Sequence, residues 1–198
     1  MKNTATLTTS ALLALTLSNT TLASDYVFDT EHTNVQFAVN HNGLSNFIGQ
    51  FQSFDGKFKV NEKDLTKSSF NVTIDAASID TDVKALDDHL KNEDFLDVAR
   101  YPKITFKSGK ITQVSNDRYA VEGELTMHGQ TRPVTLDARL NFQGRHPLAD
   151  YFDQYNRDYV GFSASTTLLR SDFGMTTYAP ALADQVNIRI ETELKRVN

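Results

Sequence analysis

The 198-residue sequence contains no cysteine and no tryptophan. Without cysteine the chain can form no disulfide, no zinc–thiolate site, no thiol nucleophile and no cysteine-linked lipid anchor. Long apolar runs are lacking as well, since the run at residues 11–17 is far too short to cross a bilayer. A fold without these supports depends on its hydrophobic core, which suits a closed sheet.

An excess of positive charge is also absent. The formal net charge is −5, from 20 basic and 25 acidic residues. This balance argues against nucleic acid as a partner and against electrostatic docking on anionic membranes. With 39% hydrophobic residues, a chain of this length favours one domain with an adequate core.

Motifs of catalysis are missing too. No phosphate-binding glycine loop of either common kind is present. Residues 161–165 fall one residue short of a nucleophile elbow, and they lie within a strand pattern rather than at a strand-to-helix turn. None of the five histidines belongs to an H-x-H or H-E-x-x-H pair; His89 with Glu93 is the nearest signal, and the acidic residues around them read as a solvated helix face. No catalytic residue, metal site or cofactor is therefore predicted.

The N-terminal residues have the pattern of a secretory signal peptide. Lys2 supplies a minimal positive start, residues 11–17 are apolar, and Thr21 and Ala23 place small residues at the −3 and −1 positions. The pattern predicts a leader over residues 1–23, which is removed from a mature domain over residues 24–198.

Most of the remaining chain alternates apolar and polar residues with the period of a β-strand. The predicted strands are residues 34–41, 49–60, 69–75, 103–114, 119–127, 134–142, 159–169 and 185–195. The apolar parity shifts between Phe51 and Phe54 and again around Ser108-Gly109, which predicts two β-bulges.

One stretch, residues 78–102, predicts a helix instead. Val83, Leu86 and Leu90 form a narrow apolar stripe, Asp80 or Thr81 is expected to cap its start, and Pro102 prevents its continuation. A single amphipathic helix among strands is expected to close the open end of a barrel as a lid.

Eight strands in hairpin order predict an all-β fold, an antiparallel lipocalin-like barrel with one helical lid segment. A two-sheet sandwich is the alternative. Thirteen Phe and seven Tyr are available to face inward. Composition alone favours a filled core, because inward-facing residues look the same whether they contact each other or a ligand.

Several motifs resemble the YceI family of bacterial lipid-binding proteins. Within the helical stretch they are Ser78-Ile79-Asp80-Thr81, His89-Leu90, Asp94-Phe95, Asp97 and Arg100-Tyr101-Pro102. Outside it they include Tyr26, Asp29 and His32, Val35-x-Phe37-x-Val39-x-His41, Gly49-x-Phe51, Phe54-x-Gly56, Gly123-x-Leu125-Thr126-x-His128-Gly129-x-Thr131-x-Pro133-Val134, Arg170-x-Asp172-Phe173-Gly174 and Asp184-x-Val186-x-Ile188.

The resemblance implies an exported, periplasmic, eight-stranded barrel that holds a polyisoprenoid, such as a prenylated quinone or prenyl pyrophosphate, or another long amphiphile. It also implies that homodimers occur. Transient contact with a membrane is a further expectation for a lipid carrier. Residues 144–157 depart from the family pattern, because they form a polar insertion containing Tyr151, Phe152 and Tyr155.

The predicted ligand-binding residues share the inward strand face: Phe37, Val39, Val72, Ile74, Ile104, Phe106, Leu125, Leu136, Phe162 and Ile188. The predicted lid residues are Val83, Leu86, Leu90 and Phe95. Arg170 with Asp172 is interpreted as an ion pair at the barrel end, and a role for Arg170 with an anionic head group is the alternative.

These features favour a carrier or sequestering protein for a long-chain isoprenoid lipid rather than an enzyme. Two other functions stay open. One is a hydrolase that uses His and Asp at the barrel mouth, through His32, His89 or His128. The other is a packed barrel that binds proteins through its aromatic insertion.

Overall fold

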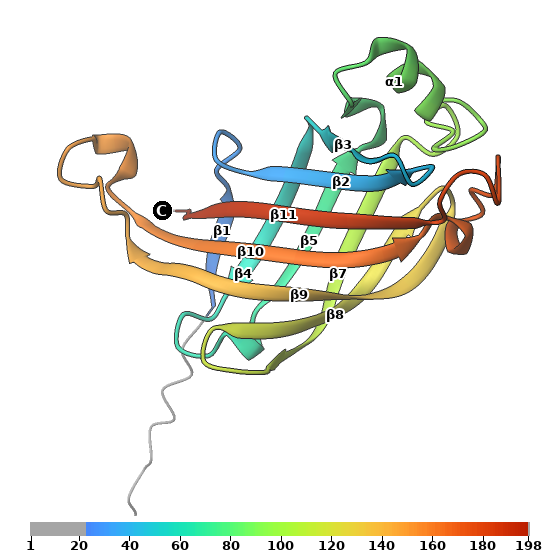
Figure 1. Ribbon diagram of the computed structural model, residues 1–198. Coiled ribbons are helices and arrows are strands. Elements are labelled where there is room, and N and C mark those ends of the chain that lie inside the picture. The colour runs from blue at the N-terminus through green and yellow to red at the C-terminus, as the bar shows by residue number, and fades with distance from the viewer. Residues whose placement is uncertain (1–22, 198) are drawn as a thin grey trace, which may run out of the picture.

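The computed structural model describes residues 23–197, which form a closed antiparallel barrel (Figure 1). All but the last residue of the predicted leader lie outside this range. In spatial order the eight barrel strands are β1 (Ser24–Phe28), β4 (Phe54–Val60), β5 (Ser69–Asp75), β7 (Lys103–Gln113), β8 (Arg118–Met127), β9 (Gln130–Arg145), β10 (Asp158–Leu169) and β11 (Gln185–Arg196). β11 closes the barrel by pairing with β1. The predicted eight-stranded barrel is confirmed, and the sandwich alternative is wrong.

A smaller sheet extends the barrel at one end. It consists of β2 (Asn34–His41), β3 (Ser45–Phe51) and β6 (Ile79–Asp80). β11 pairs with β2 through residues 186–191 and with β1 through residues 194–196, so it changes partner near Thr192 and Glu193. The extension gives the barrel two different ends.

The predicted strand over residues 49–60 is in fact two strands. β3 pairs with β2 and β6, whereas β4 pairs with β1 and β5. At the break between them, the backbone N–H of Gln52 donates to the carbonyl of Ser78 and that of Ser53 to its hydroxyl. The parity shift therefore marks a strand break here, and the predicted bulge is wrong.

Other local predictions had mixed outcomes. The bulge at Ser108-Gly109 is confirmed by a shift of register between Ser108 and Ile111. A further shift between Gly161 and Phe162 was not predicted. β1 was missed as well, because its five residues offer only Tyr26 and Phe28 as an inward pair.

The helix is much shorter than the predicted helical stretch over residues 78–102. α1 covers only Lys84–Leu90, and turns occupy most of residues 91–101. Neither Asp80 nor Thr81 caps it: the N-cap is Val83, and Thr81 instead donates to the Asp87 carboxylate through its N–H (2.8 Å) and hydroxyl (2.6 Å).

Short 3₁₀ turns are η1 (Leu65–Lys67), η2 (Ala76–Ser78), η3 (Asp153–Tyr155) and η4 (Arg170–Phe173). Across residues 23–197 there is no helix with the length and apolarity needed to cross a membrane.

The core has two parts. The first, here the closed-end core, surrounds Tyr26, Val160 and Leu194, and the rings of Phe58, Phe70 and Phe106 stack into it. The second, the mouth core, surrounds the following buried residues: Ala76, Ile79, Leu96, Ile104, Phe173 and Met175. The mouth core lies at the end that α1 covers.

The insertion forms a loop at the opposite end of the barrel from α1 (Figure 1). Its aromatic tip is solvent-exposed, with Tyr151 77% and Phe152 50% accessible. Tyr155 instead packs inward, stacking on His146 with ring centroids 4.2 Å apart.

Candidate functional site

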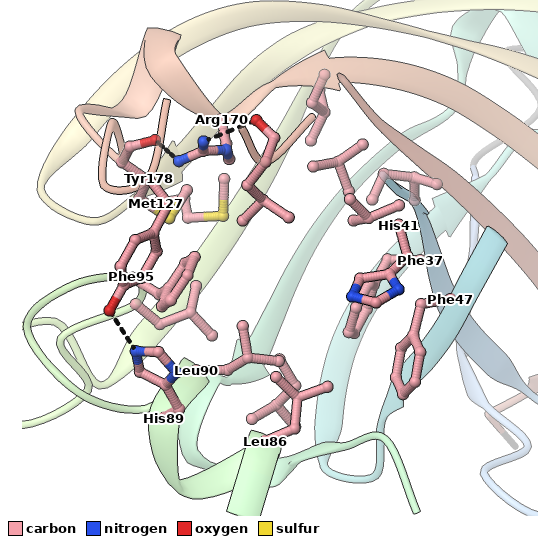
Figure 2. Close-up of a pocket in the computed structure, with 18 of the residues that line it drawn as sticks. Phe37, His41, Phe47, Leu86, His89, Leu90, Phe95, Met127, Arg170 and Tyr178 are labelled. Atoms are coloured by element: carbon pink, nitrogen blue, oxygen red, sulfur yellow. Dashed lines mark hydrogen bonds between the residues drawn. The ribbon is translucent and has the colours of Figure 1, made fainter. Parts of the chain in front are cut away.

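A cavity of about 550 Å³ lies at the mouth end of the barrel, between α1, the β2–β3 sheet and β11 (Figure 2). Its lining is almost entirely apolar. The strands supply Phe37, Val39, Phe47, Phe51, Ile79, Met127, Leu168, Val186 and Ile188, and the covering segments supply Leu86, Leu90, Phe95, Leu96, Met175, Ala181 and Leu182. This volume is within the usual range for sites that bind a small organic molecule.

Polar side chains around the cavity gather at its rim. His41 is the last residue of β2 and Asn42 follows it; both are exposed, and Tyr178 is 53% accessible. His89 extends from α1 on the other side of the opening (Figure 2). The arrangement places an apolar interior behind a rim that can form hydrogen bonds.

Gly49 shapes one wall of the cavity. A Cβ atom at this position would lie 2.3 Å from Cζ of Phe37, which faces it across the β2–β3 ladder. Glycine therefore allows the Phe37 ring to approach β3 in its present position, and any larger residue would require the ring to shift. The ring also packs against Phe51, at 5.9 Å between centroids.

The lid is joined to the segment between β10 and β11 by aromatic contacts. The His89 ring makes an edge contact with Phe95 at 5.1 Å and with Tyr178 at 5.8 Å, and Phe95 lies 6.1 Å from Tyr178. Nε2 of His89 is 3.5 Å from the Tyr178 hydroxyl and 3.4 Å from the Asp94 carboxylate. Such contacts are individually modest.

Arg170 organises the segment that carries Tyr178. The buried guanidinium donates four hydrogen bonds to backbone carbonyls: those of Met175 (2.6 Å), Thr177 (2.8 Å), Ala183 (3.1 Å) and Leu182 (3.2 Å). The predicted ion pair with Asp172 is wrong. Carbonyl oxygens satisfy most of the buried charge instead, and they fix the loop that contributes Met175, Tyr178 and Leu182 to the cavity.

Two other hollows differ from this one. A hollow of about 630 Å³ along β8–β11 is bordered by exposed polar residues such as Arg118, Asp137 and Asn187. A cavity of about 90 Å³ lies in the closed-end core, beside Phe58 and Phe162. The mouth cavity alone among the three combines room for a ligand with a continuous apolar lining.

Residues 26–194 match the family model of the YceI-like domain. A UPF0312 protein from Serratia proteamaculans is 38% identical over 174 residues, which cover 87% of this chain and 86% of that protein. The chain belongs to the YceI-like family. A second relative, a UPF0312 protein from Pectobacterium carotovorum, is 35% identical over 189 residues, or 94% of each chain.

Solved structures of similar fold agree with this membership. The YceI protein of Campylobacter jejuni has a TM-score of 0.71 at 27% identity, over 81% of this chain and 91% of that one. Burkholderia cenocepacia BcnA has a TM-score of 0.73 at 24% identity, over 84% and 98%. A polyisoprenoid binding domain from Saccharophagus degradans has a TM-score of 0.61 at 14% identity, over 89% and 99%.

All ten predicted ligand-binding residues of this YceI-like protein lie inside the barrel, but they do not form one site. Phe37, Val39 and Ile188 line the mouth cavity. Four others belong to or pack against the closed-end core: Val72, Phe106, Leu136 and Phe162. The last three belong to or pack against the mouth core: Ile74, Ile104 and Leu125.

Three of the four predicted lid residues face the cavity. Leu86, Leu90 and Phe95 line it. Val83 does not, and its side chain is 46% exposed. The prediction that Val83 faces the cavity assumed that the helix includes this residue. Val83 is instead the extended N-cap residue before the first turn, so its side chain points elsewhere.

Sequence reasoning missed several lining residues. Leu168 and Val186 continue the strand parity of Phe162 and Ile188, so the pattern already contained them. Tyr178 and Leu182 lie in a loop, where no periodicity predicts the direction of a side chain. They reach the cavity because Arg170 holds that loop across the mouth.

Proposed function

We propose that this protein binds a long-chain isoprenoid lipid, of the prenylated quinone or prenyl pyrophosphate class, or a similar amphiphile. The tail would occupy the mouth cavity and the polar head would lie at the rim. The observation that carries this proposal is the apolar composition of the lining: 16 of its 21 residues are apolar, and the polar ones are His41, Asn42, His89, Arg170 and Tyr178.

Energetics support a tail-first mode of binding. Each buried CH₂ group contributes about 0.8 kcal/mol, so a tail of about twenty carbons contributes on the order of 16 kcal/mol before ordering costs are subtracted. That sum approaches the limit of non-covalent affinity. The head group therefore needs only to orient the ligand, for which the hydrogen-bonding rim residues suffice.

The relationship to known proteins points the same way. The Saccharophagus degradans domain is described as polyisoprenoid binding, and it shares the barrel fold. At 14% identity the comparison carries the fold, so the choice of ligand class here rests mainly on the cavity itself.

We further propose that the protein carries or sequesters its lipid in the periplasm. The leader-like residues 1–23 support export, and a barrel that encloses the lipid tail suits transfer between membranes, with transient contact at each one. A ligand held by a buried tail leaves slowly unless a cover moves. The lid residues Leu86, Leu90 and Phe95 would form that cover.

Binding without catalysis is the simpler interpretation of the histidines. Nδ1 of His128 donates a hydrogen bond to the Phe173 carbonyl, His89 lies at the rim, and His32 lies in the β1–β2 turn. If the protein were a lipid hydrolase, alanine at one of these positions would abolish turnover. We expect the alanine variants of His128, His89 and His32 to behave like the unaltered protein when each is incubated with a lipid mixture, with no change in the composition of that mixture.

A pair of variants on one strand tests the proposal. Val39 faces the cavity and Ala38 faces the other side of β2. Titration with a prenylated quinone in detergent-free buffer should give saturable binding, weakened at least about tenfold in Val39→Trp and unchanged in Ala38→Trp. Equal affinity in both variants would place the ligand elsewhere and refute the proposal.

A further inference from the structure

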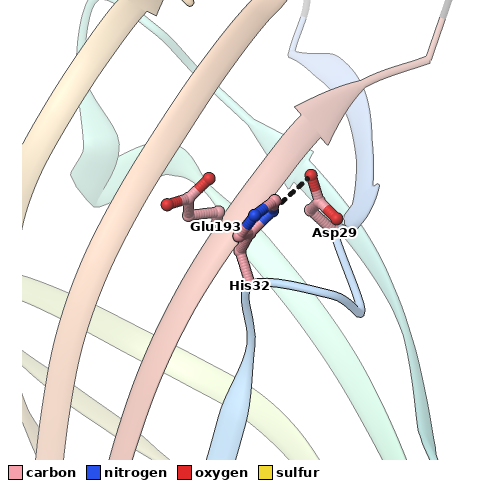
Figure 3. Close-up of side chains that lie close together, drawn as sticks. All are labelled: Asp29, His32 and Glu193. Atoms are coloured by element: carbon pink, nitrogen blue, oxygen red, sulfur yellow. Dashed lines mark ion pairs between the residues drawn. The ribbon is translucent and has the colours of Figure 1, made fainter. Parts of the chain in front are cut away.

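Three side chains with metal-ligating atoms meet where β11 changes partner (Figure 3). Asp29 and His32 belong to the turn between β1 and β2, and Glu193 belongs to β11. One ring nitrogen of His32 and one carboxylate oxygen of each acid all lie within 4.8 Å of one another. Ligands of a tetrahedral zinc ion are about 3.3 to 3.5 Å apart, so a small inward movement of the side chains brings all three into bonding range.

The backbone holds this turn on β11. The Asp29 N–H donates to the Glu193 carbonyl at 2.8 Å, and the His32 N–H donates to the Asp29 carbonyl at 3.2 Å. The hydroxyls of Thr33 and Thr192 share a hydrogen bond of 3.1 Å beside them. The three side chains thus project from a scaffold that is already fixed, which lowers the entropic cost of bringing them together.

Asp29 is a buried carboxylate with partners suited to orienting a ligand. Its Oδ2 atom lies 3.3 Å from Nδ1 of His32 and accepts a hydrogen bond of 3.3 Å from the Tyr159 hydroxyl.

Glu193 has no comparable engagement. Within residues 23–197 its carboxylate takes part in no ion pair and accepts no hydrogen bond. Two carboxylates this close to each other are unfavourable unless a cation lies between or beside them. The neighbouring cationic groups are His32, which pairs with Asp29, and Lys195, whose charge also acts on Asp29.

We propose that Asp29, His32 and Glu193 bind a divalent transition-metal cation, with zinc the best match. One imidazole nitrogen and two carboxylate oxygens are common zinc ligands, and water would complete the coordination. Calcium would need six to eight oxygen ligands. The bound ion would pin the β1–β2 turn to β11 at the seam of the barrel, so it would stabilise the fold. This site is separate from the mouth cavity, and the proposal does not depend on lipid binding.

Calorimetric titration of the untagged protein with zinc chloride, after removal of metals by chelation and dialysis, tests the proposal. We expect one equivalent to bind and the melting temperature to rise. Glu193→Gln, which keeps the shape of the side chain, and His32→Ala should each weaken zinc binding at least about tenfold. His146→Ala is the matched control, because His146 lies at the same end of the barrel and stacks on Tyr155, but is not one of the three ligands; it should bind zinc normally.

Absence of zinc binding by the unaltered protein would overturn the proposal. So would equal affinity in Glu193→Gln, or loss of binding in His146→Ala alone, which would place zinc on a surface histidine. Circular dichroism checks that each variant is folded. If Glu193→Gln does not fold, His32→Gln decides the question by the same criterion.

Discussion

Gly49 and Phe37 illustrate how single residues define the cavity wall. The sequence pattern assigned Phe37 to the interior, but it gave no reason for a glycine opposite the ring. The structure supplies that reason, since a Cβ atom at Gly49 would overlap Phe37. At this scale the inward face of a strand can be predicted from parity, whereas the close approach of two particular residues requires the register.

Gly49→Ala tests this contact. The added methyl group must displace the Phe37 ring toward the cavity or push β3 outward, which costs about 1 to 3 kcal/mol of folding free energy and lowers ligand affinity. Gly161→Ala is the control, because the nearest atom to its Cβ would be 3.7 Å away. Urea denaturation measures both variants. Equal stability of the two would show that the Phe37 contact does not constrain the wall.

Tyr159 gives the fold a dependence on alkaline pH. Burial, followed by the negative charge and hydrogen bond of Asp29, raises the pKa of Tyr159 to about 12 from its ordinary value of 10.0. Because the folded-state pKa is raised, the associated stability is complete below pH of about 10 and is lost as the pH rises toward about 12. Burial likewise raises the pKa of Tyr26, which acts in the same direction.

We therefore expect the free energy of unfolding to fall across that window, by about 2 kcal/mol for Tyr159 alone. Tyr159→Phe cannot lose a proton, so its stability should fall less over the same interval. Denaturation at a series of pH values from 9 to 12 makes the comparison. Parallel pH profiles for the two proteins would contradict the assignment.

At the scale of elements, the lid was only partly predictable. An apolar stripe predicted a cover, and three of its residues do line the cavity. The length and cap of the helix were predicted wrongly, because the Asp87 carboxylate binds Thr81 from within the first turn and holds the preceding residues extended. A side chain that hydrogen-bonds backward over six residues leaves no signature in hydrophobic periodicity.

The contact between the lid and the β10–β11 segment predicts a change in exchange rate. Tyr178→Ala removes the ring contacts with both His89 and Phe95. Two such contacts contribute about 1 to 3 kcal/mol together, so release of a bound prenylated quinone to acceptor vesicles should accelerate about tenfold or more. Tyr151→Ala is the control, since that ring is exposed at the opposite end. An unchanged release rate in Tyr178→Ala would show that these ring contacts do not limit opening of the lid.

At the scale of the whole molecule, alternation in the sequence predicted the barrel correctly but not the division of its interior. The inward residues at Val72, Phe106 and Phe162 pack into a largely filled core, whereas those at Phe37, Val39 and Ile188 border a cavity. Their side chains are of the same kinds. What separates them is the strand break at 52–53, the β2–β3 extension and the loop held by Arg170, all of which depend on contacts between distant parts of the chain.

Export is a further prediction for the whole molecule. If residues 1–23 are a cleaved leader, protein recovered from the periplasm should begin at Ser24. Replacing Ala23 with a bulky residue should slow cleavage and leave precursor at the membrane. N-terminal sequencing of fractionated cells measures both. Recovery of the uncleaved chain from the cytoplasm would contradict the predicted location.

Native mass spectrometry of protein purified from its own cells without detergent tests the central claim most directly. A mouth cavity that binds lipid predicts a complex heavier than the chain by the mass of one isoprenoid lipid, released on activation and much depleted in Val39→Trp. A spectrum containing only the bare chain, under conditions in which a known lipid carrier retains its ligand, would contradict it.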